Sequence, residues 1–187
     1  MNNENLLISK ILQGDIDAFS SLVRLYQNQL FSFLYKLTHS REETEDLLQE
    51  VFIRVYNYLY KYNNTYSFST WIYRITYNTY NTAYKKKKSQ PVSYSIDDIP
   101  QKLFSLEGCP EKSFETKEQY LTIMNLIDSL NSEQKTVFLL RHVKDFSFKE
   151  ISTIMGVSQE ASRMKYHRAK KTLARNLEMN KKRGLHL

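Results

Sequence analysis

The scarcity of glycine and proline is the feature that most limits what this chain can fold into. Its 187 residues include only four glycines and three prolines. Both residue types interrupt regular helices. Between them, apolar residues recur at three- and four-residue steps, which is the spacing of one face of an α-helix, and no useful length shows the alternation of a strand. The sequence therefore predicts an all-α protein.

Composition excludes several classes of protein. A hydrophobic content of 41% is enough for a packed core. Cys109 is the only cysteine, which excludes an internal disulfide framework and a cysteine-built zinc site. No apolar run approaches the roughly 18 residues of a membrane span, and the N-terminus lacks the basic segment of a signal peptide. We therefore expect a cytoplasmic protein with no membrane span, metal site or cofactor.

The net charge of +7 is concentrated at two places. Residues 85–88 are four consecutive lysines, and residues 161–187 carry a net charge of +8. Basic charge confined in this way indicates a polyanion held at two points, with nucleic acid as the first candidate. A solubilising lysine patch and a frayed basic tail would explain the charge alone equally well.

Helical periodicity divides the chain into two parts. The pattern fails between Ser89 and Phe114, a stretch that contains all three prolines and is longer than most connections inside one domain. We therefore predict two small helical domains, residues 1–88 and 115–187, joined by a flexible linker at 89–114. Within the first domain, Ser40 and Glu43 have the spacing of a capping box at the start of a helix.

The second part has the signals of a helix–turn–helix. Ser147 and Glu150 form a second capping box, Gly156 suits a left-handed helix end, and Ser158 suits the cap of the last helix. The N-terminal part of such a second helix enters the major groove, so its outer face is the predicted DNA contact. The residues of this face are Arg163, Met164, His167, Arg168 and Lys171.

Two alternatives apply to this face. It could be a solvated basic surface on a helix whose only role is packing. Metal binding by His167 is dismissed, because no second histidine lies three or four residues beyond it. If the face does bind DNA, Arg163 and His167 are placed for base edges, and Arg168 and Lys171 for phosphates.

Five segments in order resemble the sigma-70 family of bacterial sigma factors, in its extracytoplasmic-function (ECF) group. They are "GDIDAFSSLVRLY", "EDLLQEVFIRVY", "FSTWIYRITYNT", "SLNSEQKTVFLLRHVKDFSFKEISTIMGVS" and "YHRAKKTL". The resemblance implies a non-enzymatic subunit that joins core RNA polymerase at the largest-subunit coiled coil and the flap. It also implies recognition of the promoter −10 and −35 elements and help in separating the strands. Family members are commonly held inactive by an anti-sigma factor.

The resemblance assigns polymerase docking to one face of the second predicted helix. Ile53 is an apolar residue among polar ones on this exposed side, which is typical of a contact patch. A solvated face with one stray isoleucine is the alternative. The predicted docking residues are Asp46, Gln49, Glu50, Ile53 and Asn57.

The segment before the lysines is rich in aromatic residues. Tyr73, Tyr77, Tyr80 and Tyr84 form one stripe on a helix, which fits either stacking on unpaired bases or simple core packing. In the family, a base flipped out of the −10 element sits in a pocket built partly by the loop that here contains Tyr62. The predicted −10 contacts are Tyr62, Phe68, Trp71, Arg74, Asn78, Lys85 and Lys86.

Two other functions explain part of the sequence. A two-domain helix–turn–helix regulator acting without polymerase would explain the last helix but not the docking face. A nucleic-acid-processing enzyme is disfavoured, because no H-E-x-x-H, P-loop or G-x-S-x-G motif is present. The last helix departs from the family pattern at Glu160, where a glycine is usual, so its DNA sequence preference is open.

Overall fold

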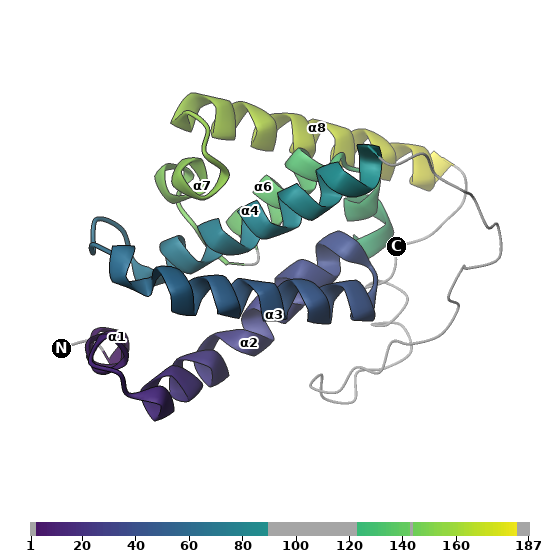
Figure 1. Ribbon diagram of the computed structural model, residues 1–187. Helices are drawn as coiled ribbons and strands as arrows, with labels where there is room; N and C mark the ends of the chain where they lie inside the picture. The colour runs from purple at the N-terminus through teal and green to yellow at the C-terminus, as the bar shows by residue number, and fades with distance from the viewer. Residues whose placement is uncertain (1–2, 90–122, 143, 183–187) are drawn as a thin grey trace, which may run out of the picture.

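The computed structural model describes residues 3–89, 123–142 and 144–182. Within these ranges every regular element is a helix, which confirms the predicted all-α class (Figure 1). The predicted linker at 89–114 and the predicted start of the second domain at residue 115 lie, apart from Ser89, outside the described residues.

The first two helices form a corner. α1 spans Asn3–Leu12 and α2 spans Ile16–Thr38. Asp15 caps α2, because its side chain accepts a hydrogen bond of 3.0 Å from the backbone N–H of Ala18. No helix is predicted at α1 from the sequence, and α1 is held in place by packing on α2, where Tyr26 donates a hydrogen bond to the Glu4 carboxylate.

The next helices carry the predicted docking and −10 residues. α3 spans Arg41–Tyr58 and runs into a short 3₁₀ helix, η1, at Leu59–Lys61. After a loop, α4 spans Phe68–Ser89. The predicted capping box at the start of α3 is only half formed: Ser40 accepts from the backbone N–H of Glu43, but the Glu43 carboxylate pairs with Lys87 of α4 instead of reaching back.

The C-terminal part contains the predicted helix–turn–helix. Residues 123–128 are helical, and α6 (Ser132–His142), α7 (Phe148–Met155) and α8 (Gln159–Lys182) follow. The predicted caps are confirmed. Ser147 and Glu150 form a reciprocal capping box, Gly156 ends α7 with a φ of 66°, and Ser158 accepts from the backbone N–H of Ala161 at 3.1 Å.

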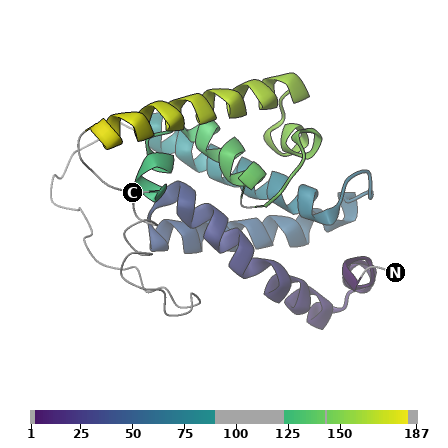
Figure 2. The ribbon, with the colours of Figure 1, turned by 180° about the vertical axis from the view of Figure 1, so that it is seen from behind.

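The two helical parts pack against each other. In both views α4 lies between the α2–α3 pair and the group formed by α6, α7 and α8 (Figures 1 and 2). α4 packs on α7, and the Tyr73 and Phe146 rings meet edge to face with centroids 5.1 Å apart. Buried side chains of both parts belong to one continuous core cluster, which includes Leu22, Leu34, Val51, Ile72, Leu140 and Ile151.

Candidate polymerase and nucleic-acid interfaces

The predicted docking residues share the exposed side of α3. Asp46, Gln49 and Asn57 are exposed, and Ile53 is 48% exposed. Glu50 is half-buried and pairs with Arg54 one turn away, at 2.6 Å between Arg54 Nε and Glu50 Oε1. The structure therefore brings these residues onto one surface, with an apolar side chain among the polar ones.

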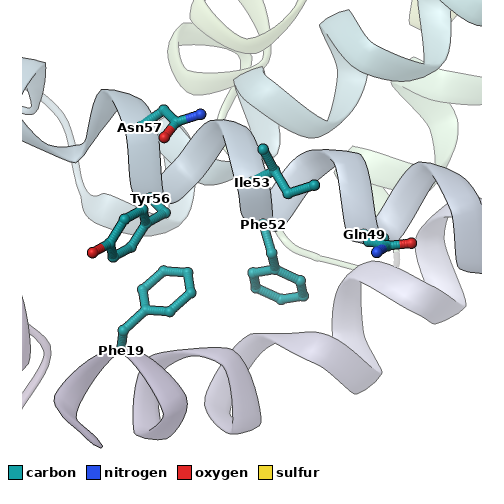
Figure 3. A pocket seen from close by; sticks show the side chains of 6 residues that line it. All are labelled: Phe19, Gln49, Phe52, Ile53, Tyr56 and Asn57. Carbon is teal, nitrogen blue, oxygen red and sulfur yellow. The ribbon is translucent and has the colours of Figure 1, made fainter. Parts of the chain in front are cut away.

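A pocket of about 370 Å³ adjoins this surface between α2 and α3 (Figure 3). Phe19 of α2 and Tyr56 of α3 meet edge to face at one end, with ring centroids 5.0 Å apart. The lining residues are Phe19, Gln49, Phe52, Ile53, Tyr56 and Asn57. Sequence reasoning missed the three aromatic residues of the lining. The available signal was the spacing of Phe52 and Tyr56, which places two aromatic side chains one turn apart beside the polar face.

The loop before α4 folds back onto an aromatic cluster of Tyr62, Phe68 and Trp71. The Tyr62 ring centroid lies 5.3 Å from that of Phe68 and 5.6 Å from that of Trp71. The Tyr62 hydroxyl donates to the Tyr66 carbonyl at 3.0 Å, which ties the two ends of the loop together. Burial, with the nearby Glu4 carboxylate, raises the pKa of the Tyr62 hydroxyl, so it stays a neutral donor.

The aromatic cluster has one buried member and two members that reach the surface. Phe68 is 1% exposed, so it supports the cluster from behind and is not a surface contact, contrary to the prediction for this residue. Tyr62 and Trp71 are half-buried and reach the surface. The reason is that the first turn of α4 points Phe68 inward, against Tyr26 of α2.

The polar and basic residues of α4 are on the surface. Arg74, Asn78, Lys85 and Lys86 are all exposed. The tyrosine stripe, in contrast, is mostly core: Tyr73, Tyr77 and Tyr80 are at most 6% exposed, and Tyr84 alone is 40% exposed. Of the two explanations of the stripe, core packing is therefore the one that holds for its first three members.

The outer face of α8 presents every residue predicted there. Arg163, Met164, His167, Arg168 and Lys171 are exposed, whereas Ser162 and Ala169 on the inner face are fully buried. The Ser162 hydroxyl donates to the backbone, with Gln159 O at 2.7 Å and Phe148 O at 3.2 Å, so a polar residue is accepted at this packed position. The Arg163 guanidinium lies 5.9 Å from the Phe148 ring centroid, at the junction of α7 and α8.

Neither a membrane-spanning helix nor a metal site is found in the part of the chain that the structure describes. None of the helices described here is long and apolar enough to cross a membrane. Across residues 3–89, 123–142 and 144–182, no group of three or more His, Cys, Asp or Glu side chains is placed to hold a metal ion.

A capped helix–turn–helix with an exposed basic outer face places the chain among DNA-binding proteins. Two family models extend this assignment to both helical parts: Sigma-70 region 2 matches residues 22–90, and Sigma-70 region 4 matches residues 120–173. The chain belongs to the sigma-70 family of RNA polymerase sigma factors, in the ECF group.

Relatives and solved structures are similar along most of the chain. The ECF RNA polymerase sigma factor SigW of Bacillus subtilis is 28% identical, over 91% of this chain and 94% of the relative. The ECF RNA polymerase sigma-E factor of Escherichia coli K12 is 27% identical, over 91% and 92%. CnrH, solved in complex with the cytosolic domain of CnrY, superposes with a TM-score of 0.70 at 16% identity, covering 96% of this chain and 99% of that one. The sigma factor RpoE of Bartonella quintana, solved with the anti-sigma factor NepR, gives 0.66 at 16% identity, over 86% and 96%.

Proposed function

We propose that the chain is a dissociable, non-enzymatic specificity subunit that binds core RNA polymerase, recognises the −10 and −35 elements of a promoter and helps to open the DNA. Under this proposal residues 1–88 dock on polymerase and open the −10 element, residues 115–187 bind the −35 element, and 89–114 link them. Family membership supports the sigma factor role. The exposed surfaces of α3, α4 and α8 support polymerase docking, −10 binding and −35 binding, respectively.

The observation that carries the proposal is the α3 surface. Ile53 is 48% exposed beside a pocket lined by aromatic residues, on a helix that is separate from both basic DNA-binding candidates. Exposed apolar side chains around a concave site are typical of a protein contact. A regulator that acted on duplex DNA alone would have no use for this surface, so it favours the sigma factor over that alternative.

The −10 role is assigned to the loop before α4 and the exposed row on α4. Tyr62 and Trp71 offer aromatic faces at the surface, and Asn78 offers an amide that can donate to and accept from a base edge. Lys85 and Lys86 follow on the same helix and are suited to phosphates. Stacking supplies about 1–3 kcal/mol per base, comparable with the few kcal/mol that unpairing costs, so the strands can be held open without ATP.

Reconstituted transcription tests the proposal. Core polymerase supplied with this chain should give promoter-dependent run-off transcripts from fragments of its own genome, and permanganate should reveal reactive thymines near the start sites. The matched control is core polymerase with the Asp46→Ala and Glu50→Ala double variant. Absence of both transcripts and reactive thymines with the unmodified chain would refute the sigma factor role, and tight operator binding without polymerase would favour the regulator.

We also infer that an anti-sigma factor holds this chain inactive. Support comes from the similarity of the fold to that of a sigma factor solved with an anti-sigma factor. Members of the family are also commonly held inactive by such a partner. A tagged copy purified from its own cells should retain, besides polymerase subunits, one further protein at near-stoichiometric amount, which mass spectrometry would identify. Adding that protein to the reconstituted reaction should abolish the transcripts, and an unchanged yield would contradict the inference.

A further inference from the structure

The first helix, α1, lies beside the proposed −10 site and has no assigned role so far. In both views α1 is at the same end of the α2, α3 and α4 group as the loop before α4 (Figures 1 and 2). It packs on α2 and also contacts η1, the segment that leads into Tyr62. Ile8 and Ile11 anchor α1 in the core, since they are 6% and 8% exposed. α1 is therefore a fixed neighbour of the site.

A hydrogen bond joins α1 to a buried side chain of α2. Tyr26 donates its hydroxyl to the Glu4 carboxylate. Because Tyr26 is only 3% exposed, Glu4 supplies the acceptor that this hydroxyl needs away from water. Burial raises the pKa of Tyr26, and Glu4 raises it further, so the hydroxyl remains a donor. The position of the Tyr26 ring is thereby set from α1.

From Tyr26 the contacts continue ring by ring to the surface. The Tyr26 and Phe68 rings meet edge to face, with centroids 5.5 Å apart. The Phe68 centroid lies 5.3 Å from that of Tyr62 and 5.5 Å from that of Trp71. Phe68 is 1% exposed and close-packed, so it cannot turn without moving its neighbours. A change at Glu4 therefore reaches the two surface rings through the two buried ones.

We propose that Glu4 and Tyr26 are positioning residues for the proposed −10 site, and that they hold its two surface rings in the orientation that receives an unpaired base. This inference rests on the proposed promoter-opening function and gives α1 a part in it, although neither residue contacts DNA. Rings that are ordered beforehand lose less freedom when a base stacks on them. More of the stacking free energy is then left to hold the strand open.

Glu4 offers both a hydrogen-bond acceptor and a negative charge, and the two have different effects. Its charge also acts on Tyr62, whose pKa is raised by burial and, to a smaller extent, by Glu4. An anion near the site repels the phosphates of a strand, so the charge alone does not favour binding. Replacing Glu4 by glutamine removes the charge but keeps an acceptor for the Tyr26 hydroxyl. The positioning role therefore predicts that glutamine can replace Glu4 and leucine cannot.

The first test observes the surface rings in the free chain. Trp71 is the only tryptophan, so tryptophan fluorescence reports on this cluster alone. Glu4→Leu and Tyr26→Phe should each shift the emission to longer wavelength and increase its quenching by acrylamide, because a loosened ring is reached by water more often. Glu4→Gln should match the unmodified chain. Asn5→Leu, which places the same side chain at an exposed neighbouring position of α1, is the matched control.

The second test measures the rate at which reconstituted holoenzyme opens a promoter, from the permanganate reactivity of thymines. Glu4→Leu and Tyr26→Phe should each lower this rate about threefold or more while affinity for core polymerase stays within about twofold. Glu4→Gln and Asn5→Leu should leave the rate within about twofold of the unmodified chain. Combining Glu4→Leu with Tyr26→Phe should cost no more than either change alone, because both remove the same hydrogen bond. Circular dichroism confirms that every variant is folded at the temperature used.

Three results would contradict the proposal. If Glu4→Leu and Tyr26→Phe only lower the melting temperature and leave Trp71 emission and promoter opening unchanged, α1 contributes stability alone and the −10 role stands without it. If Glu4→Gln loses as much as Glu4→Leu, the hydrogen bond is not what positions the rings. If Trp71 responds as expected but the unmodified holoenzyme opens no promoter, the −10 role fails and the positioning role falls with it.

Discussion

His142, at the contact between α6 and α8, has a lowered pKa. His142 Nε2 and the Tyr166 hydroxyl are 2.7 Å apart, and the His142 ring lies 4.4 Å from that of Phe138, centroid to centroid. Burial lowers the pKa of His142, and the positive charges of Arg141 and Lys170 lower it further, against a smaller opposing effect of Asp145. The imidazole is therefore neutral in the folded chain at pH 7, and it shares a hydrogen bond with the Tyr166 hydroxyl.

This lowered pKa predicts that acid weakens the packing of α6 on α8. The stabilising contribution of His142 is complete above the ordinary histidine pKa of about 6.5. It is lost as the pH falls below that value, because the unfolded chain then binds the proton more readily. Between pH 7.5 and 5.5 the melting temperature should fall further for the unmodified chain than for His142→Gln, which shares every other titrating group. Equal falls would show that His142 contributes nothing to the pH dependence.

Substitutions of Arg163 and Lys171 should affect DNA binding in different ways, although both residues are exposed cations on α8. Arg163 lies in the first turns, where side chains reach base edges, so Arg163→Ala should cost about 1–3 kcal/mol on the preferred −35 sequence and relax the choice at one position. Lys171 lies farther along and suits a phosphate, so Lys171→Ala should weaken binding to all sequences alike. Holoenzyme binding to a randomised −35 library measures both. Uniform losses for both variants would remove the base-reading role from Arg163.

At the scale of single elements, α3 supplies a prediction about assembly. Ile53→Ala, and separately the Asp46→Ala and Glu50→Ala pair, should each reduce affinity for core polymerase by about fivefold or more, since anchor residues of an interface cost over 1 kcal/mol when truncated. Glu45→Ala is the control, because it removes an exposed acid of the same helix that pairs with Arg41, one turn away on α3. Fluorescence anisotropy with core polymerase gives the affinities, and circular dichroism checks the helicity. Losses as large for Glu45→Ala would indicate a general charge effect.

The elements predicted from sequence are those whose signals are local. Ser147, Gly156 and Ser158 form the expected bonds because a cap depends only on neighbours a few residues away. α1 was not predicted, since its position depends on a contact between Glu4 and Tyr26, 22 residues apart. The capping box at Ser40 is incomplete for the same reason: Lys87, 44 residues away, takes the Glu43 carboxylate.

The same distinction between local and long-range signals applies to the residues of the candidate sites. The exposed residues of α8 were predictable, because helical spacing alone separates them from Ser162 and Ala169. The burial of Phe68 and of Tyr73 was not, because it depends on which helices cover α4. Spacing places an aromatic stripe on one face, but only packing with α2 and α7 decides that this face is the inner one.

For the molecule as a whole, the contacts between the two helical parts are polar as well as apolar. The Thr70 hydroxyl of α4 donates to the Glu150 carboxylate of α7 at 3.3 Å. Asp128 lies 3.0 Å from His39 Nε2, and Lys135 Nζ lies 2.7 Å from both Asp128 Oδ1 and His39 Nε2, so a polar cluster joins the turn after α2 to the C-terminal part. The Thr70–Glu150 and His39–Asp128 contacts link residues far apart in sequence, and neither is signalled by local pattern. The sequence therefore predicts the two parts but not their packing.

This packing is too compact for both promoter elements at once. A folded chain of 187 residues has a radius of gyration of about 16 Å, and hence a diameter of about 40 Å. The −10 and −35 elements are named by their positions, which are about 25 base pairs apart. At 3.4 Å per base pair this spacing is roughly 85 Å. Simultaneous contact by α4 and α8 therefore requires the two parts to separate. We expect the packed arrangement to be inactive in transcription.

Cross-linking across the polar cluster of His39, Asp128 and Lys135 tests this expectation. Cysteines at positions 39 and 128, in a Cys109→Ser background, replace side chains that touch in the packed arrangement and are partly exposed. Joined by a short bis-maleimide, the chain should lose promoter-dependent transcription by tenfold or more, since the parts cannot separate to span the promoter. The same variant blocked with a mono-maleimide lacks the polar cluster equally but stays free to open, so it should retain activity. Full activity of the cross-linked chain would show that the parts bind the promoter without coming apart.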